Sequence, residues 1–110
     1  MRSNAPTKMH IRVPSVVAVA VPASLVALLS ERLNPFPVHY ASTYNYGIEL
    51  LAESRPRVAL LAVSAEQFKA FDELARDLRC TSILYVPTAS TESIAKSIER
   101  ELLATGDDHG

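Results

Sequence analysis

The stretch Val16-Val17-Ala18-Val19-Ala20-Val21-Pro22 decides how this chain folds. Its six small or β-branched apolar residues match the length and composition of a buried β-strand. Pro22 ends the run, because proline inside a helix removes a backbone hydrogen bond and clashes with the preceding turn. Beyond Pro22 the apolar residues take the spacing of one helical face, at Leu25, Leu28, Leu29 and Leu33. The sequence therefore predicts a strand over about 15–21 and a helix over about 23–33.

The same region has a second interpretation, because residues 13–30 carry no charge and follow a basic N-terminal segment. A signal peptide or a membrane-spanning helix also has this pattern. Pro22 falls in the middle of the run, where a spanning helix would lose a backbone bond, and the β-branched residues before it favour a strand. We therefore expect a soluble cytoplasmic protein that binds no membrane. Cleavage near Ala23, or recovery in a membrane fraction, would contradict this expectation.

The rest of the chain repeats the alternation of strand and helix. Further strands are predicted over about 38–42, 57–63 and 82–86, and further helices over about 45–54, after Ser64 and after Ser90. Ser64 and Gln67 form a capping-box pattern, Ser90 is a second N-cap, and Gly106 ends the last helix. Helical spacing predicts two apolar stripes that face the core: Ile48, Leu51 and Ala52 on the second helix, and Phe68, Phe71, Leu74, Ala75 and Leu78 on the third. On the last helix, Glu92 and Lys96 form an i, i+4 pair on the outer side. Strand 57–63 is apolar on both faces, as strands are when helices cover both sides of a sheet.

Right-handed crossovers turn such an order of elements into one parallel sheet with helices on both faces. The two most apolar strands, 15–21 and 57–63, belong at the centre, and the more polar second strand suits an edge. We thus predict an α/β fold with three layers (αβα) and a short parallel sheet of about four strands in the order 2-1-3-4. The domain spans 13–104, between a flexible lead-in at 1–12 and a flexible acidic tail at 105–110.

Composition excludes several classes of protein. Apolar residues make up 48% and charged residues 21% of the chain, which is ordinary for a globular domain and argues against disorder. The net charge of -1 predicts no direct nucleic-acid partner. The single cysteine, Cys80, excludes an internal disulfide framework, and the three histidines stand too far apart for a paired metal motif. No glycine belongs to a phosphate-binding loop. With no metal motif and no such loop, we expect neither a metal nor a cofactor.

In a parallel α/β sheet, ligands bind at the carboxyl ends of the strands. None of the predicted strand ends carries Asp, Glu, His, Lys or Cys. Acid–base and nucleophilic catalysis lack their groups there, so we predict that the protein is not an enzyme. Hydroxyl side chains do gather at these ends, at Ser64, Thr88, Ser90 and Ser93. They suit either of two roles: capping helix N-termini, or holding phosphate or another anion beside the backbone N–H groups.

Three stretches carry a likeness to a known family: Val16–Leu25, Pro56–Val63 and Ile83–Ala89. With the order of elements over about 14–103, they resemble the strands of response-regulator receiver domains, which have a flavodoxin-like fold. The resemblance is one of scaffold and hydrophobic pattern. It implies the same three-layer architecture for this chain.

The residues that perform phosphotransfer in receiver domains have no counterpart here. The family's acidic pair after the first strand holds Mg²⁺, and the matching positions are Ala20 and Val21. The phospho-accepting aspartate falls at Ala62, Thr88 is nearest to the conserved Ser/Thr, and no fifth strand with its lysine follows. The resemblance therefore implies a truncated pseudo-receiver that is not phosphorylated on aspartate and works by binding partners, commonly as a dimer.

The predicted function is a non-catalytic signalling or regulatory module that binds proteins. Without a fifth strand, the apolar strand 82–86 lies at a sheet edge, which invites pairing with another chain. We predict a homodimer or a docked protein partner along this strand and the last helix, through Ile83, Tyr85, Ile94 and Ile98. Two alternatives stay open. One is a protein that binds a small ligand, phosphate or nucleotide through the strand-end hydroxyls, and the other is the N-terminal part of a transcriptional regulator.

Overall fold

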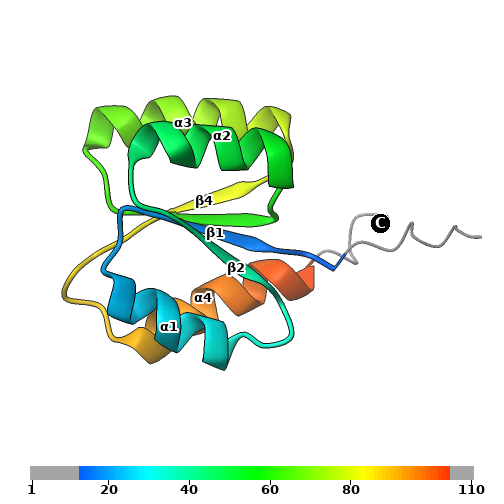
Figure 1. Cartoon of the computed structure of the whole chain (residues 1–110), viewed down its shortest axis with the longest axis vertical. Coiled ribbons are helices and arrows are strands. Elements are labelled where there is room, and N and C mark those ends of the chain that lie inside the picture. The colour runs from blue at the N-terminus through cyan, green and yellow to red at the C-terminus, as the bar shows by residue number, and fades with distance from the viewer. Residues whose placement is uncertain (1–12, 105–110) are drawn as a thin grey trace, which may run out of the picture.

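The computed structural model describes residues 13–104, so the predicted lead-in, the tail and the helix end at Gly106 lie outside the described residues. Strands and helices alternate along the chain (Figure 1). The strands are β1 (Val16–Val19), β2 (Val38–Ala41), β3 (Val58–Leu61) and β4 (Thr81–Leu84). The helices are α1 (Ala23–Arg32), α2 (Tyr44–Ser54), α3 (Ala65–Asp77) and α4 (Thr91–Leu103). Every predicted element is present, although each strand is shorter than predicted.

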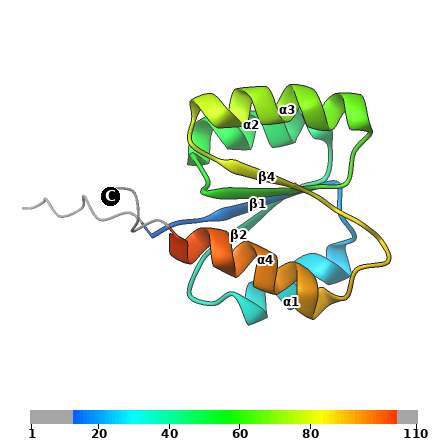
Figure 2. The ribbon, with the colours of Figure 1, turned by 180° about the vertical axis from the view of Figure 1, so that it is seen from behind.

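All four strands are parallel and stand in the order β2-β1-β3-β4. The register places Val16 of β1 beside Val38 of β2 and Val58 of β3. Helices α1 and α4 cover one face of the sheet, and α2 and α3 cover the other (Figures 1 and 2). The predicted α/β class, the three-layer flavodoxin-like architecture and the strand order are confirmed.

Alternate residues of the central strands build two separate cores. On β1, Val16 and Ala18 pack in the core beneath α1 and α4, whereas Val17 and Val19 pack beneath α2 and α3. All the residues of β1 and β3 are fully buried. Because successive side chains of a strand point to opposite faces, a strand that is apolar throughout can supply both cores at once. This property places β1 and β3 at the centre of the sheet.

Two helices bury a set of side chains that differs from the predicted one. On α2, Leu50 is buried, whereas Ala52, predicted to face the core, is exposed. On α3, Phe71 and Ala75 are buried, but Leu74, predicted on the same stripe, is 46% exposed. The reason is geometric, because Ala52 and Leu74 lie on the flanks with which the two helices face each other. They line the space between the helices and do not pack against the sheet.

The uncharged run 13–30 does not form one long helix. It is divided between β1 and α1, and Ala20 between them adopts the left-handed backbone conformation (φ 59°). Among residues 13–104, no helix combines the length and the apolar character that a membrane-spanning segment needs. The strand–turn–helix interpretation of this run is therefore confirmed.

Candidate functional site

The carboxyl ends of β1 and β3 form the floor of the crevice where α/β proteins of this topology bind ligands. The amide of Ala62 donates to the carbonyl oxygen of Val19 at 3.0 Å, and the amide of Ala20 donates to that of Ala41 at 2.7 Å. Ala20 and Ala62 thus lie at the ends of adjacent strands, as predicted, and both are half-buried. Val21, which follows, is only 2% exposed and packs in the core beneath α1 and α4. This floor presents methyl groups where a cation would need oxygen ligands.

The strand-end hydroxyls serve mainly as helix caps. Ser64 Oγ accepts a hydrogen bond from the amide of Gln67 at 3.1 Å, and the Gln67 side chain bonds the Ser64 amide in return. Ser90 Oγ accepts from the amide of Ser93 at 3.0 Å. Both predicted caps are confirmed. Thr88 and Ser93 are exposed, and the four residues are divided between α3 on one face of the sheet and the region of α4 on the other.

The described residues 13–104 contain no acidic or thiol cluster suited to a metal ion. Within the part of the chain that the structure describes, no three His, Cys, Asp or Glu side chains form a group that could hold a metal ion. Cys80 lies just before β4, at the opposite end of the strands. Its burial raises the pKa of the thiol to about 12, so Cys80 stays protonated at neutral pH. It behaves as a small core side chain and not as a nucleophile.

The strand β4 forms one edge of the sheet, and Figure 2 shows it nearest the viewer. The amides of Thr81 and Tyr85 donate to carbonyl oxygens of the β3 segment at 2.9 and 2.7 Å. Alternate residues of a parallel strand bond the same neighbour, so the intervening Ser82 and Leu84 direct their N–H and C=O groups away from β3. Within residues 13–104, no further strand pairs with that side of β4. The predicted position of this strand at a sheet edge is confirmed.

The side chains predicted for the interaction edge lie mostly inside the protein. Ile94 and Ile98 of α4 are buried in the core against the sheet, and Ile83 and Tyr85 are half-buried against the same core. The exposed apolar side chains at this edge are instead Leu84, which is 43% exposed, and Val86, which is 47% exposed. Strand alternation explains the difference, because inward-facing Ile83 and Tyr85 leave Leu84 on the other face. The surface available to a partner is therefore Leu84, Val86 and the outward backbone of β4.

A network of ion pairs joins α1 to α4. The Arg32 guanidinium donates to both carboxylate oxygens of Glu92, at 3.1 and 2.9 Å, and reaches Glu99 at 3.5 Å. These bonds lower the pKa of the Glu92 carboxyl and raise that of Arg32. The sequence pattern had paired Glu92 with Lys96 on the same helix, whereas the close partner comes from α1. This network fixes the two helices on one face and lies outside the crevice.

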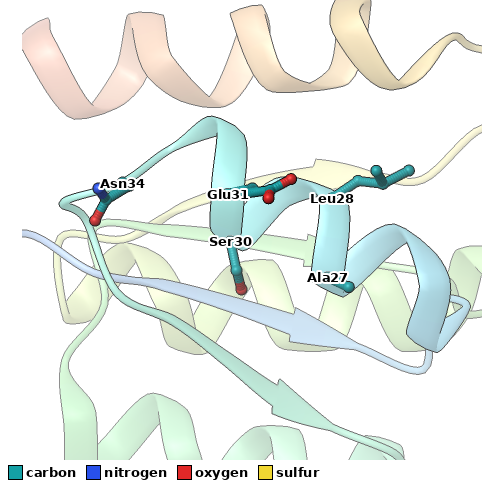
Figure 3. Close-up of a pocket in the computed structure, with 5 residues that line it drawn as sticks. All are labelled: Ala27, Leu28, Ser30, Glu31 and Asn34. Atoms are coloured by element: carbon teal, nitrogen blue, oxygen red, sulfur yellow. The ribbon is translucent and has the colours of Figure 1, made fainter.

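The hollows around α1 are open surface features. The larger has a volume of about 490 Å³ and is lined by Ala27, Leu28, Ser30, Glu31 and Asn34. Figure 3 shows that all five come from α1 and the turn after it. Because α1 and its following turn provide the whole lining, no opposite wall could enclose a ligand. A second hollow, of about 440 Å³, adds Arg32, Thr91 and Glu92 between α1 and α4.

Two features of the surface were missed by sequence reasoning. The first is the exposed pair Leu84 and Val86, which the alternation of side chains along the strand could have revealed. The second is an apolar groove between α2 and α3, into which Leu74 projects. Hydrophobic spacing predicts the stripe that faces the sheet, but it does not separate that stripe from a flank facing a second helix.

Comparisons with models of protein families, with curated proteins and with solved structures find no match to this chain. The function is therefore argued from the geometry of the crevice and of the surfaces described above.

Proposed function

We propose that this protein is a non-catalytic regulatory module of the receiver-like type that acts by binding proteins and does not accept a phosphoryl group. The observation that carries the proposal is the floor of the crevice. Ala20 and Ala62 are adjacent there and Val21 is buried, so the positions that would hold Mg²⁺ and the phosphoacceptor in a receiver offer no side-chain oxygen atoms. Regulation must then act through a surface and not through phosphorylation of this site.

Self-association through β4 is part of the same proposal. An edge strand with unpaired backbone groups and exposed apolar side chains is a template for another strand. Two copies related by a two-fold axis would place their β4 strands antiparallel and extend the sheet across the interface. Leu84 and Val86 would be covered in such a dimer. We also place the protein in the cytoplasm, which fractionation of cells would test.

The oligomeric state tests this proposal directly. We expect sedimentation velocity from low to high micromolar concentration to show a monomer–dimer equilibrium. Leu84→Lys adds a charge to the edge and should shift the equilibrium to monomer. Leu103→Lys is the matched control, because Leu103 is also exposed but lies at the end of α4. A protein that stays monomeric throughout, or two variants with equal effects, would overturn self-association through β4.

Phosphotransfer is tested separately. Incubation of the protein with acetyl phosphate and Mg²⁺, followed by intact-mass spectrometry, should show no phosphorylated species. A covalently phosphorylated species under these conditions would contradict the proposal that the protein does not accept a phosphoryl group. A thermal-shift screen with phosphate, nucleotides and acyl phosphates should show no rise in Tm, because any ligand that binds the folded state raises its apparent stability.

Anion binding is the second candidate, favoured by one hollow on α4. Ser93, Lys96 and Arg100 line this hollow of about 390 Å³ together with Ser90, Glu92 and Ser97. The two cations and the hydroxyls suit a phosphate, but Glu92 lies in the same hollow and Ser90 Oγ is already used as a cap. A rise in Tm with phosphate that Lys96→Ala abolishes would establish this second function.

A further inference from the structure

The outer surface of α2 and α3 carries an apolar groove between the two helices. It has a volume of about 270 Å³ and is lined by Ile48, Leu51, Ala52, Leu74, Asp77 and Leu78. Only Asp77 among these residues is charged, and Leu74 projects far enough to remain 46% exposed. This volume is below the range of about 300–1,000 Å³ that small-molecule sites occupy, but it accommodates a large apolar side chain. We name this feature the α2–α3 groove.

Carboxylates flank the α2–α3 groove on both sides. Successive helical residues are about 100° apart, which places Glu49 and Glu53 on the outer ridge of α2. The same geometry places Glu73 and Asp77 on the ridge of α3 that faces them. All four side chains are exposed. The α2 helix contains no lysine or arginine.

The two cations of α3 lie outside the stretch of that helix that lines the groove, each for a different reason. Arg76 pairs with the carboxylate one turn before it at 2.9 Å. Arg76 lies about 160° around the helix from Leu74, on the far flank. Lys69 belongs to the same i, i+4 row as Glu73 and Asp77, but it precedes the first α3 residue that lines the groove by five residues, or about 7.5 Å along the helix. Arg55 and Arg79 follow the last residues of the two helices, so they lie at one end of the groove and not along its walls. Beside the lining residues, the walls therefore carry carboxylates on both sides of an apolar floor, and the cations lie at the ends of the groove or on the far flank of α3.

This surface favours a helix as its occupant over an extended segment. The backbone groups of α2 and α3 are bonded within the helices, so they offer no edge to which an extended chain could add as a strand. A helix satisfies its own backbone and needs only side-chain contacts, with apolar residues at i, i+4 and i+7 filling a groove. Lysine or arginine beside those residues would face the carboxylates on both ridges.

We propose that the α2–α3 groove docks a basic amphipathic helix of a protein partner. Charge complementarity sets the chemistry of that partner, and the apolar floor sets the periodicity of its anchor residues. The groove lies on the α2–α3 layer, whereas self-association is assigned to the backbone edge of β4. The two proposals can therefore be tested independently, and Leu84→Lys should leave binding at the groove unchanged.

A synthetic peptide provides the test with the full chain. The probe is a helix of about four turns with leucines at i, i+4 and i+7 and lysines beside them. Its acidic twin replaces each lysine by glutamate, and a scrambled peptide of the same composition has no apolar face. Fluorescence anisotropy measures affinity, and NMR chemical shifts map the contact. We expect the basic helix to bind about tenfold or more tightly than either control peptide, with shifts centred on Ile48, Leu74 and Leu78.

Matched variants distinguish binding at the groove from nonspecific electrostatic or hydrophobic attraction between the peptide and the protein. Leu74→Ser removes the exposed apolar side chain and should weaken the basic helix by about tenfold, whereas Leu103→Ser on α4 should not. Glu49→Gln with Glu73→Gln should weaken binding and flatten its salt dependence, whereas Glu31→Gln on α1 should leave both unchanged. The proposal is overturned if the acidic twin binds equally well, if shifts scatter over the surface, or if the control variants match the groove variants.

The same measurements would identify either of two other occupants of the groove. If Leu74→Ser abolishes self-association in sedimentation velocity, the occupant is a second copy and the proposal is wrong. If reversing the charges of Arg2, Lys8 and Arg12 shifts the resonances of the groove residues in the free protein, the occupant is the N-terminal segment of the chain itself. Unchanged self-association and unchanged groove resonances support a separate basic partner.

Discussion

Gly47 allows α2 to lie close against the central strand of the sheet. A Cβ atom at this position would lie 2.8 Å from Cγ2 and 2.9 Å from Cγ1 of Val19. Val19 is fully buried in the central strand β1, and its branched side chain is stiff at χ1. It has no room to move aside. The absent side chain of Gly47 thus sets the distance between α2 and β1.

We predict that Gly47→Ala destabilises the protein. Overpacking against Val19 should lower the free energy of unfolding by about 1–3 kcal/mol, with alanine's better helix propensity offsetting up to about 1 kcal/mol. Denaturant unfolding followed by circular dichroism measures the change. Val19→Ala removes both obstructing methyl groups, so Gly47→Ala should cost less in that background. Equal costs in the two backgrounds would show that the contact with Val19 is not the cause.

At the crevice, the position of Ala20 was predicted from the sequence, but its backbone conformation was not. The run of β-branched residues placed Ala20 at the end of the first strand, next to Ala62 of the third, and the hydrogen bonds confirm this adjacency. The left-handed conformation of Ala20 was not predictable, because alanine carries no preference for it and a left-handed L-residue costs about 1–2 kcal/mol. The surrounding backbone imposes that conformation. The identity of a residue therefore does not predict backbone strain of this kind at the crevice.

At the scale of elements, the N-caps of two helices were predicted, but the backbone conformation at the C-terminal ends of α2 and α3 was not. Ser64 with Gln67, and Ser90, cap α3 and α4 as predicted, because an N-cap is a local bond between a side chain and a nearby amide. The ends of α2 and α3 have left-handed arginines, Arg55 and Arg79, at positions where glycine is usual. Nothing in the identity of an arginine indicates that role.

The end of α3 makes a specific prediction. The amide of Arg79 donates to the Arg76 carbonyl at 3.1 Å, and the amide of Cys80 donates to the Ala75 carbonyl at 2.9 Å, which together form a Schellman motif. Arg79 has φ 59°, so Arg79→Gly should raise the free energy of unfolding by about 0.5–1 kcal/mol by relieving strain. Thermal or denaturant unfolding measures the gain.

A glycine elsewhere on α3 is the control for that gain. Ala70→Gly, at an exposed position inside α3, should instead cost about 1 kcal/mol, because glycine in a helix interior loses backbone entropy. If Arg79→Gly also destabilised the protein, the left-handed conformation would not be a source of strain.

The ion pairs between α1 and α4 make a pH-dependent prediction. The hydrogen bonds from Arg32, with smaller help from Lys96, lower the pKa of Glu92 in the folded protein. A carboxyl group with a lowered pKa stabilises the fold above its unfolded pKa, and this contribution is lost as the pH falls through the folded value. We expect the Glu92 carboxyl carbon to titrate, by NMR, below the ordinary glutamate value.

Arginine variants identify the source of that shift. Arg32→Gln should move the Glu92 titration upward, because it removes both hydrogen bonds to the carboxylate. Arg100→Gln, in the last turn of α4, should leave the titration in place. A Glu92 titration that is the same in wild type and Arg32→Gln would contradict the structure of this network. Added salt should weaken the contribution, since the pair lies at the surface.

For the whole molecule, the two central strands followed from the sequence because a central position depends on hydrophobicity, and the connections between parallel strands then gave the order. Strands apolar on both faces need neighbours on both sides and helices on both faces, which fixes β1 and β3 at the centre. Which side chains remain exposed depends instead on how neighbouring helices and strands pack against one another. Leu74 and Leu84 are apolar in sequence like core residues, yet one faces a gap between helices and the other an open edge. Such residues become visible only when the layers are assembled.

Hydrogen exchange of the whole sheet provides the sharpest test of how its open edge is used. The amides of Ser82 and Leu84 point away from β3, whereas Thr81 and Tyr85 donate to it, so we expect faster exchange for the outward pair in dilute protein. Pairing of two β4 strands would bond those outward amides and slow their exchange as the concentration rises. The amide of Tyr40 on the opposite edge strand β2 is the internal reference and should not respond to concentration. If Tyr40 slows and Leu84 does not, β2 is the edge that associates and the assignment to β4 fails.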